Sequence, residues 1–447
     1  MNFESIKRSL IAALEENKVD KYEVYYFSSK GTSVDTLNNE INAFSDGTTG
    51  GICLRIATDG KMGYASTELM SDAEIQNLVY RALENAKYME KEDTVGLFAG
   101  SKSYETPSCQ EYVPLETAEL KALAIDLAGK MYAYSDKIKD GTSSSAFASE
   151  FSIRLFNSYG LDLENHCGVN GVWADAVVCD NDEFESAFSF KEYKDGLDTD
   201  ALAKDAVNEA LEKIGSALVP TGKYNVIIAG KQMRSILSAF SSVFSSKNAQ
   251  MGLSLLAGKE GEVIASDIVT ITDDPMREGV SIQTHFDGEG VATHRKSVIE
   301  KGVLKTLLYN RETALKAGKE TTANASKGSY AAPVGISPYA FCIEAGDKTL
   351  DQLFEMAENG IFVTEVKGLH AGVNAASGDF SIESAGFLIK DGKKAEAVKS
   401  FTIAGNFFDL LKSISALSDK VEMGVPSGFT TFGSPAVLIK DMSVAGK

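Results

Sequence analysis

The sequence contains few cysteines, few prolines and no long hydrophobic run. Its five cysteines are odd in number, scattered along 447 residues and never spaced as C-x-x-C. This pattern excludes a disulfide framework and indicates free thiols in a reducing compartment. Only 8 prolines accompany 44% hydrophobic residues, which is typical of an ordered, soluble protein. Because no apolar stretch approaches the ~20 residues needed to cross a membrane, we expect a cytoplasmic protein with no membrane partner.

The first residues, MNFESIKRSLIAALEENK, follow the pattern of an amphipathic helix. Phe3, Ile6, Leu10 and Leu14 recur at helical spacing, and acidic residues stand on both sides of the short apolar stretch. A secretory signal peptide needs an uninterrupted apolar core, so this segment is not expected to be one. The pattern agrees with a cytoplasmic location.

The acidic excess lies in one half of the chain. The net charge is -19, of which residues 1–220 carry -18 and residues 221–447 carry -1. An acidic surface repels phosphate backbones, and no Lys/Arg stripe interleaved with aromatic residues offsets it. We therefore expect no nucleic-acid partner, and we interpret the excess as a contribution to solubility.

The usual catalytic motifs are absent. The sequence has no G-x-S-x-G, no Walker A motif, no well-placed G-x-G-x-x-G, and no histidine followed by glutamate. His285 and His294 flank residues 286–290, and a metal could be imagined between them with Asp287 and Glu289. We favour a hairpin turn bearing exposed polar residues, because no supporting hydrogen-bond partners are evident. No catalytic residue and no metal ligand is assigned.

A glycine-rich stretch organises the second half of the chain. Residues 360–367 alternate as a strand and are followed by Gly368, Gly372 and Gly378; two further strands then flank the turn signal Asp391-Gly392. His370, Ser377 and Asp379 in this bend suggest a serine nucleophile, but neighbours in sequence rarely form a triad. A polar loop lining a groove is the preferred interpretation.

Strands and helices alternate irregularly along the chain, which indicates an α+β fold. Residues 22–67 and 147–193 show the patterns of several short strands, with helical patterns before and after them. We predict an N-terminal mixed α/β region with antiparallel sheets and flanking helices, and a C-terminal β-rich domain with helices. The predicted boundaries are 1–93 and 94–219 for two N-terminal subdomains, and 220–447 for the C-terminal domain, where Pro220-Thr221-Gly222 marks the change.

Three segments together resemble the TldD/PmbA family, historically labelled modulators of DNA gyrase, and specifically its PmbA (TldE) branch. They are HFDGEGVATHRKSVIEKGVLKTLLYNRETALKAG, GVNAASGDFSIESAGFLIKDG, and FTIAGNFFDLLKSI followed by GSPAVLIKDMSVAGK. GGICLRI and GKMGYAST near the N-terminus also fit, so the resemblance covers almost the whole chain. It implies a two-part α+β architecture and a dimer that encloses a lumen.

The resemblance also implies what this chain lacks. The TldD branch is a metallopeptidase with a His-Glu-x-x-x-His motif on the helix after the first strand of its C-terminal domain. The matching segment here, MRSILSAFSSVFSS, places Ser238, Ala239 and Val243 at those three positions. Without two imidazoles and a carboxylate, zinc cannot be held or its water activated. We expect this chain to bind no cofactor and the zinc to lie on a TldD-type metallopeptidase partner.

The family resemblance suggests that the partner's substrate is an extended peptide. A glycine-rich backbone suits such a substrate, because main-chain groups pair with any peptide, and the near-neutral charge of residues 221–447 agrees. Tight packing is the alternative role of the glycines. The candidate groove residues are His370, Gly372, Val373, Asn374, Gly378 and Asp379.

Three hypotheses follow for the function. The first is a subunit, inactive alone, that supports proteolysis by a TldD-type partner, with homodimerisation of the isolated chain as an alternative assembly. The second is an independent hydrolase with an unorthodox site near His370 or near His285 and His294. The third is a non-enzymatic regulator of gyrase, which the acidic charge disfavours.

Overall fold

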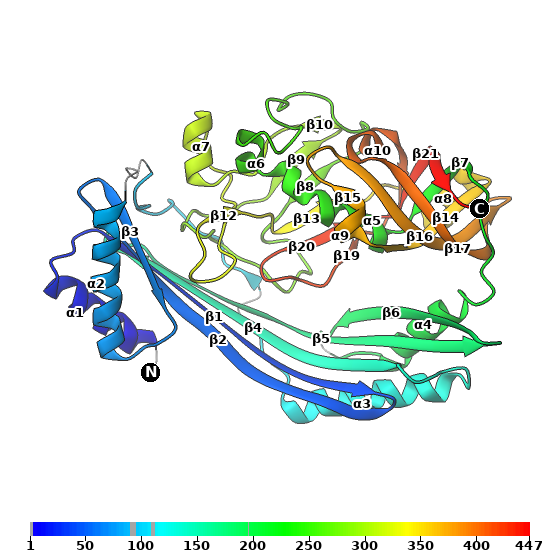
Figure 1. Ribbon diagram of the computed structural model, residues 1–447, viewed down its shortest axis with the longest axis horizontal. Helices are drawn as coiled ribbons and strands as arrows, with labels where there is room; N and C mark the ends of the chain where they lie inside the picture. Colours follow the sequence, from blue (N-terminus) through cyan, green and yellow to red (C-terminus); the bar gives the residue numbers. More distant parts are fainter. Residues whose placement is uncertain (1–2, 90–94, 109–111, 195) are drawn as a thin grey trace.

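The computed structural model describes residues 3–89, 95–108, 112–194 and 196–447. The N-terminal half forms a long curved sheet with helices on its outer face, and the C-terminal half lies against the opposite face (Figure 1). Helices and strands are mixed and most strand pairs are antiparallel, so the α+β prediction is confirmed.

The strands of the N-terminal sheet are much longer than the sequence pattern predicts. The sheet has the order β3-β2-β1-β4-β5-β6, so strands from both sides of residue 93 belong to it. Residues 22–37 form one strand and residues 162–180 another, because Gly31, Gly168 and Gly171 pair with the neighbouring strands and do not form turns. The bounds are β1 Tyr22–Leu37, β2 Glu40–Thr58, β3 Lys61–Thr67, β4 Ser143–Asn157, β5 Asp162–Asp180 and β6 Glu183–Glu192.

Helices cover the outer face of this sheet at both ends. Helices α1 (Phe3–Glu16) and α2 (Asp72–Tyr88) pack on one end through the predicted face of α1, which includes Ile6, Leu10 and Leu14. Helices α3 (Thr117–Tyr134) and α4 (Thr199–Leu211) pack on the other end through small and branched side chains. The inner face is left for the C-terminal half.

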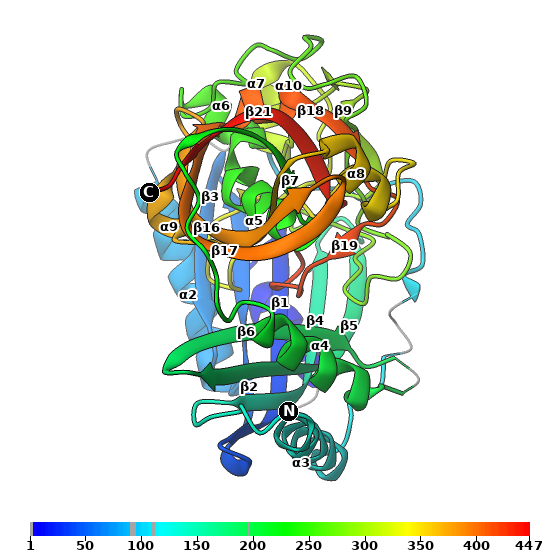
Figure 2. The same ribbon diagram turned by 90° about the vertical axis from the view of Figure 1, so that its right-hand side faces the viewer.

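The main C-terminal sheet closes into a ring. Its strands follow the order β14-β7-β21-β17-β16, and β16 also pairs with β14. The strands curve around helix α5 (Gly230–Phe240), whose apolar side chains lie in one core with their inward residues (Figure 2). The strand bounds are β7 Gly222–Ile228, β14 Gly360–Lys367, β15 Val373–Asn374, β16 Asp379–Lys390, β17 Lys393–Asn406, β18 Ile414–Leu417 and β21 Val437–Ala445.

A second sheet, of order β10-β9-β8-β13-β20-β19, lies beside this ring (Figure 1). Its bounds are β8 Ile271–Asp273, β9 Lys296–Glu300, β10 Val303–Leu304, β13 Ala340–Ile343, β19 Glu422–Met423 and β20 Thr431–Ser434. The remaining elements are η2 Ser241–Phe244, α6 Ser246–Gln250, α7 Arg311–Ala317, β11 Ala325–Ser326, β12 Gly335–Ile336, α8 Leu350–Ala357, α9 Leu369–Gly372 and α10 Phe407–Ser413.

The hairpin predicted at Asp391-Gly392 is present between β16 and β17. Both residues have positive φ, 49° and 71°, as a type I′ turn requires. The turn type matches the right-handed twist of the flanking strands, so this connection follows directly from the local sequence.

The segment from His285 to His294 forms the predicted hairpin turn, with Phe286 and Ala292 bridged in antiparallel fashion, but its polar residues are buried, so the predicted exposure is wrong. Asp287 is 2% exposed and Glu289 is 4% exposed, because the segment is enclosed at the junction between the two halves. The carboxylate of Asp287 accepts three backbone N–H bonds, from Glu289, Val291 and Ala325, at 2.9–3.1 Å. The Asp287 carboxylate therefore fixes the conformation of the turn and ties it to Ala325.

The burial of Asp287 makes stability depend on pH. Loss of hydration, aided by the charge of Glu289, raises the pKa of the Asp287 carboxyl to about 7, although the three N–H groups act in the opposite direction. An unfolded aspartate ionises near pH 4, so between pH 4 and 7 the folded state keeps a proton that the unfolded state has released. The contribution of this carboxyl to stability is therefore complete below pH 4. This stabilisation is lost as the pH rises from about 4 to 7.

Replacing Asp287 with asparagine is therefore expected to remove a pH-dependent contribution. Urea unfolding of wild type and Asp287→Asn between pH 5 and 8 measures it. The wild-type free energy of unfolding, relative to the variant, should decrease by roughly 1.4 kcal/mol per unit up to pH 7 and then level off. A difference that stays constant across this range would contradict the assigned pKa.

Candidate functional site

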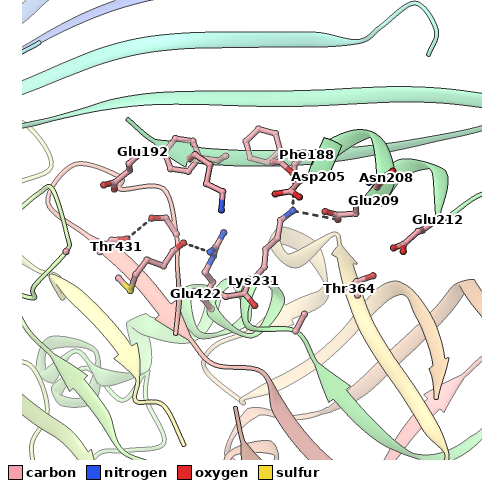
Figure 3. A pocket seen from close by; sticks show the side chains of 18 of the residues that line it. Phe188, Glu192, Asp205, Asn208, Glu209, Glu212, Lys231, Thr364, Glu422 and Thr431 are labelled. Carbon is pink, nitrogen blue, oxygen red and sulfur yellow. Dashed lines mark hydrogen bonds and ion pairs between the residues drawn. The ribbon is translucent and has the colours of Figure 1, made fainter. Parts of the chain in front are cut away.

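A cleft lies between the two halves of the chain beside helix α5. Its volume is about 690 Å³, and it is lined by β6 and α4 on the N-terminal side and by α5, β14 and β19 on the C-terminal side. Figure 3 shows Phe188 and Glu192 on one wall and Glu422 and Thr431 on the other. We call this hollow the interdomain cleft.

Two cationic side chains from the start of α5 reach opposite walls of the interdomain cleft. Lys231 Nζ donates to the carbonyl of Phe188 on β6 at 2.6 Å and lies 3.8 Å from Glu209 Oε1. Arg234 Nη1 donates to the carbonyl of Met423 on β19. Burial lowers the pKa of the Arg234 guanidinium, and the charge of Glu422 opposes this shift. Each cation therefore donates a hydrogen bond to a backbone carbonyl of an edge strand.

A row of ion pairs joins the acidic N-terminal half to the C-terminal half beside the cleft. Lys213 bridges to Glu365 at 3.0 Å and Lys394 to Glu212 at 2.7 Å. Lys399 contacts Glu185 at 2.8 Å and also Glu183. Part of the acidic excess thus serves the contact between the halves in addition to solubility.

A shallower hollow of about 400 Å³ continues from the cleft over the side of α5. The two share Arg234 and Gly424. Ser238 and Ala239 line the shallow hollow, whereas Val243 is fully buried in the core. The positions aligned with the metal motif therefore present a hydroxyl, a methyl group and no accessible side chain. Within the described ranges, no three His, Cys, Asp or Glu side chains are grouped so that they could hold a metal ion.

The predicted groove residues lie together at the outer rim of the ring. His370 is exposed on α9, and Val373 and Asn374 form β15, which pairs with Phe380 and Asp379 of β16. From this glycine-rich bend, only Leu369 lines the shallow hollow. The residues are therefore gathered in one place, beside the hollow, and their role in peptide binding stays a prediction.

Packing accounts for two of the glycines in this bend. A Cβ atom on Gly372 would lie 2.4 Å from the Ser381 carbonyl oxygen. Gly378 has φ +82°, and a Cβ there would lie 2.9 Å from the Asn406 side chain. The side chains of Asn374 and Asp379 take part in the turn, since Asn374 accepts backbone N–H groups and Asp379 accepts the Asn406 amide.

The histidines suggested by the sequence make no catalytic arrangement that the described residues support. His285 Nδ1 lies 3.2 Å from Asn165 Oδ1 and connects the two halves, while burial lowers the pKa of the His285 and His294 imidazoles. The sequence motifs do not point to the interdomain cleft. One local signal is present in EFESAFSFKE, where aromatic residues recur at every second or fourth position and mark one face of the strand that lines the cleft.

Family models and related proteins agree with this architecture. Residues 22–86, 112–214 and 221–446 match domain 1, the central domain and the C-terminal domain of the PmbA/TldA metallopeptidases. The chain is similar to Metalloprotease PmbA of Escherichia coli O157:H7, with 24% identity over 99% of this chain and 96% of that protein.

Solved structures show the same fold over the full length. A Thermotoga maritima protein described as a candidate modulator of a DNA gyrase superposes with a TM-score of 0.89 at 28% identity, covering 99% of this chain and 100% of that one. TldE from Thermococcus kodakarensis gives the same TM-score at 22% identity, with the same coverage, and shares the fold.

These similarities place the chain in the class of the PmbA/TldA metallopeptidases. The chain has a curved N-terminal sheet and a C-terminal domain whose main sheet closes into a ring. The chain belongs to the TldD/PmbA family. In the described part of the chain, no helix is long and apolar enough to cross a membrane.

Proposed function

We propose that this chain is the non-catalytic, PmbA/TldE-type subunit of a cytoplasmic metallopeptidase complex that cleaves peptides or unfolded proteins. The single observation that carries the proposal is the replacement of the metal motif by Ser238, Ala239 and Val243. None of these side chains can bind zinc as the motif would. Zinc and its activated water are assigned to a TldD-type partner, and the interdomain cleft is assigned to peptide binding.

The proposal makes a direct prediction for a reconstituted complex. Mixing the purified chain with a partner that carries the His-Glu-x-x-x-His motif should increase cleavage of an unstructured peptide over the partner alone, because the second subunit completes the peptide site. Cleavage is followed by mass spectrometry at fixed partner concentration. No increase at any ratio of the two chains would overturn the proposal.

Two controls separate the alternative hypotheses. The isolated chain is assayed for peptide cleavage with and without a chelator, and its zinc content is measured. Chelator-sensitive turnover by the isolated chain would favour an independent hydrolase. Light scattering of the isolated chain and of the mixture distinguishes a homodimer from the proposed complex.

A further inference from the structure

Strand β6 has a free edge in the interdomain cleft. Among the described residues, the edge strand β6 pairs with β5 alone, and Tyr193 N donates to Asn170 O just beyond its end. In an antiparallel ladder, alternate residues direct both backbone groups toward the partner strand and those between direct them away. The even-numbered residues of β6, including Phe188 and Phe190, therefore direct their N–H and C=O groups away from β5.

The free edge is blocked along one part and open along the next. Lys213 Nζ donates to the Ser186 carbonyl at 2.7 Å, and Lys231 Nζ donates to the Phe188 carbonyl at 2.6 Å. Lysine at a sheet edge is a known means of preventing unwanted strand pairing. Among the described residues, no side chain and no backbone group outside the sheet is bonded to the N–H or C=O of Phe190, where residues 188–192 border the cleft.

The two faces beside this open edge differ in chemistry. On the inner face, Trp173 and Phe188 lie 5.9 Å apart and Phe147 stacks on Phe190 at 6.2 Å. The helix α4 packs on the opposite face through its apolar side, and its polar side presents carboxylates to the cleft (Figure 3). Successive side chains of a strand point to opposite faces of the sheet. In a strand added at this edge, every second side chain would therefore lie over the aromatic rings, and the side chains between them would lie near these carboxylates.

The carboxylates of α4 are incompletely neutralised. Glu212 is paired with Lys394 at 2.7 Å, and Glu209 lies 3.8 Å from Lys231, at the limit of an ion pair. Within the described ranges, Asp205 has no ion-pair partner at all. Basic side chains on this face of an added strand would therefore meet complementary charge.

We propose that an extended peptide adds to the free edge of β6 at Phe190 and that the interdomain cleft favours peptides in which apolar and basic residues alternate. This inference rests on the proposed peptide-binding role and names the peptide class and the strand that holds it. Beyond the blocked Phe188 carbonyl, residues 189–192 border the cleft, and at ~3.4 Å per residue they pair with about four peptide residues. Main-chain bonds supply affinity, and the two faces supply the preference.

The test uses the isolated full-length chain and its single tryptophan. Trp173 lies beside Phe188, so its fluorescence reports an occupied edge. The probes are blocked hexapeptides of alternating lysine and valine, the same composition in two blocks, and alternating glutamate and valine. The alternating lysine peptide should bind at least tenfold more tightly than either of the others. Equal affinity for all three would overturn the inferred preference.

A matched pair of variants tests the main-chain bond. Phe190→Pro removes the outward N–H, a change that edge strands tolerate, and Phe190→Val removes the ring but keeps the N–H. Phe190→Pro should weaken binding at least tenfold more than Phe190→Val. Equal losses would overturn strand addition. If Phe190→Pro does not fold, as judged by circular dichroism, alternate N-methylation of the peptide replaces it.

The N-methylated peptides are measured against the wild-type chain. Methyl groups on the peptide N–H groups that face β6 should abolish binding, while methyl groups in the other register should have little effect; equal effects in both registers would overturn strand addition. The partner assay described above tests the subunit role separately. Selective binding without stimulated cleavage would refute only that role, and stimulated cleavage without selective binding would refute only the β6 site.

Discussion

Replacing Asp273 with alanine is expected to lower the free energy of unfolding by about 3–5 kcal/mol. The Asp273 carboxylate is fully buried; one oxygen accepts the Tyr339 backbone N–H at 2.6 Å, and the other accepts Lys296 Nζ at 3.1 Å and Asn324 Nδ2 at 2.7 Å. The Lys296 side chain is only 7% exposed. Removing the carboxylate leaves the buried Lys296 ammonium group and the Tyr339 N–H without this acceptor, and the Asn324 amide keeps only its bond to the Ser337 carbonyl. Urea unfolding followed by circular dichroism measures the loss.

An exposed ion pair near the same strand provides the control. Glu300 at the end of β9 and Lys305 lie 3.5 Å apart, with both side chains about half exposed. Glu300→Ala should cost less than about 1 kcal/mol, because water screens and replaces this contact. The double variant Asp273→Asn/Lys296→Met should recover part of the loss, since it no longer buries an unpaired charge. A loss for Asp273→Ala no larger than that for Glu300→Ala would contradict the assignment of a stabilising buried pair.

Replacing Gly386 with alanine is expected to lower the free energy of unfolding by about 3 kcal/mol. Gly386 lies in β16 where the ring closes, with β17 on one side and β14 on the other. A Cβ atom there would lie 1.9 Å from the Phe362 carbonyl oxygen, a backbone atom that cannot turn aside as a side chain could. The register of both neighbouring strands also shifts next to this residue. The added methyl group would therefore force β14 and β16 apart.

A glycine with free space around it provides the matched control. Gly129 lies within α3, and a Cβ atom there would meet nothing within 4 Å. Gly129→Ala should raise the free energy of unfolding by up to about 1 kcal/mol, because alanine has the higher helix propensity. Thermal unfolding of both variants tests the comparison. If Gly386→Ala were as stable as Gly129→Ala, ring closure would not depend on the absence of a side chain at residue 386.

Much of the local structure could be predicted from residue patterns. The face of α1, the hairpin at Asp391-Gly392 and the strand before Gly368 follow from hydrophobic period and turn chemistry, which act over a few residues. The helical spacing of Phe408, Leu411 and Ile414 predicts the apolar face of α10 less well. The buried residues of this helix are Phe407, Leu410 and Leu411, and Ile414 already belongs to β18. A helix of two turns offers too few positions for the period to define its face.

The sequence by itself determined the family, the α+β class and the absence of the zinc motif at Ser238, Ala239 and Val243, because each depends on residue identity along the chain. Only the tertiary structure decided that Asp287 and Glu289 are buried, that β14 and β16 close a ring, and that β6 has an open edge facing α5. These features arise where residues far apart in the chain, such as Phe188 and Lys231, come into contact. A local pattern carries no information about which distant surface will remove it from water.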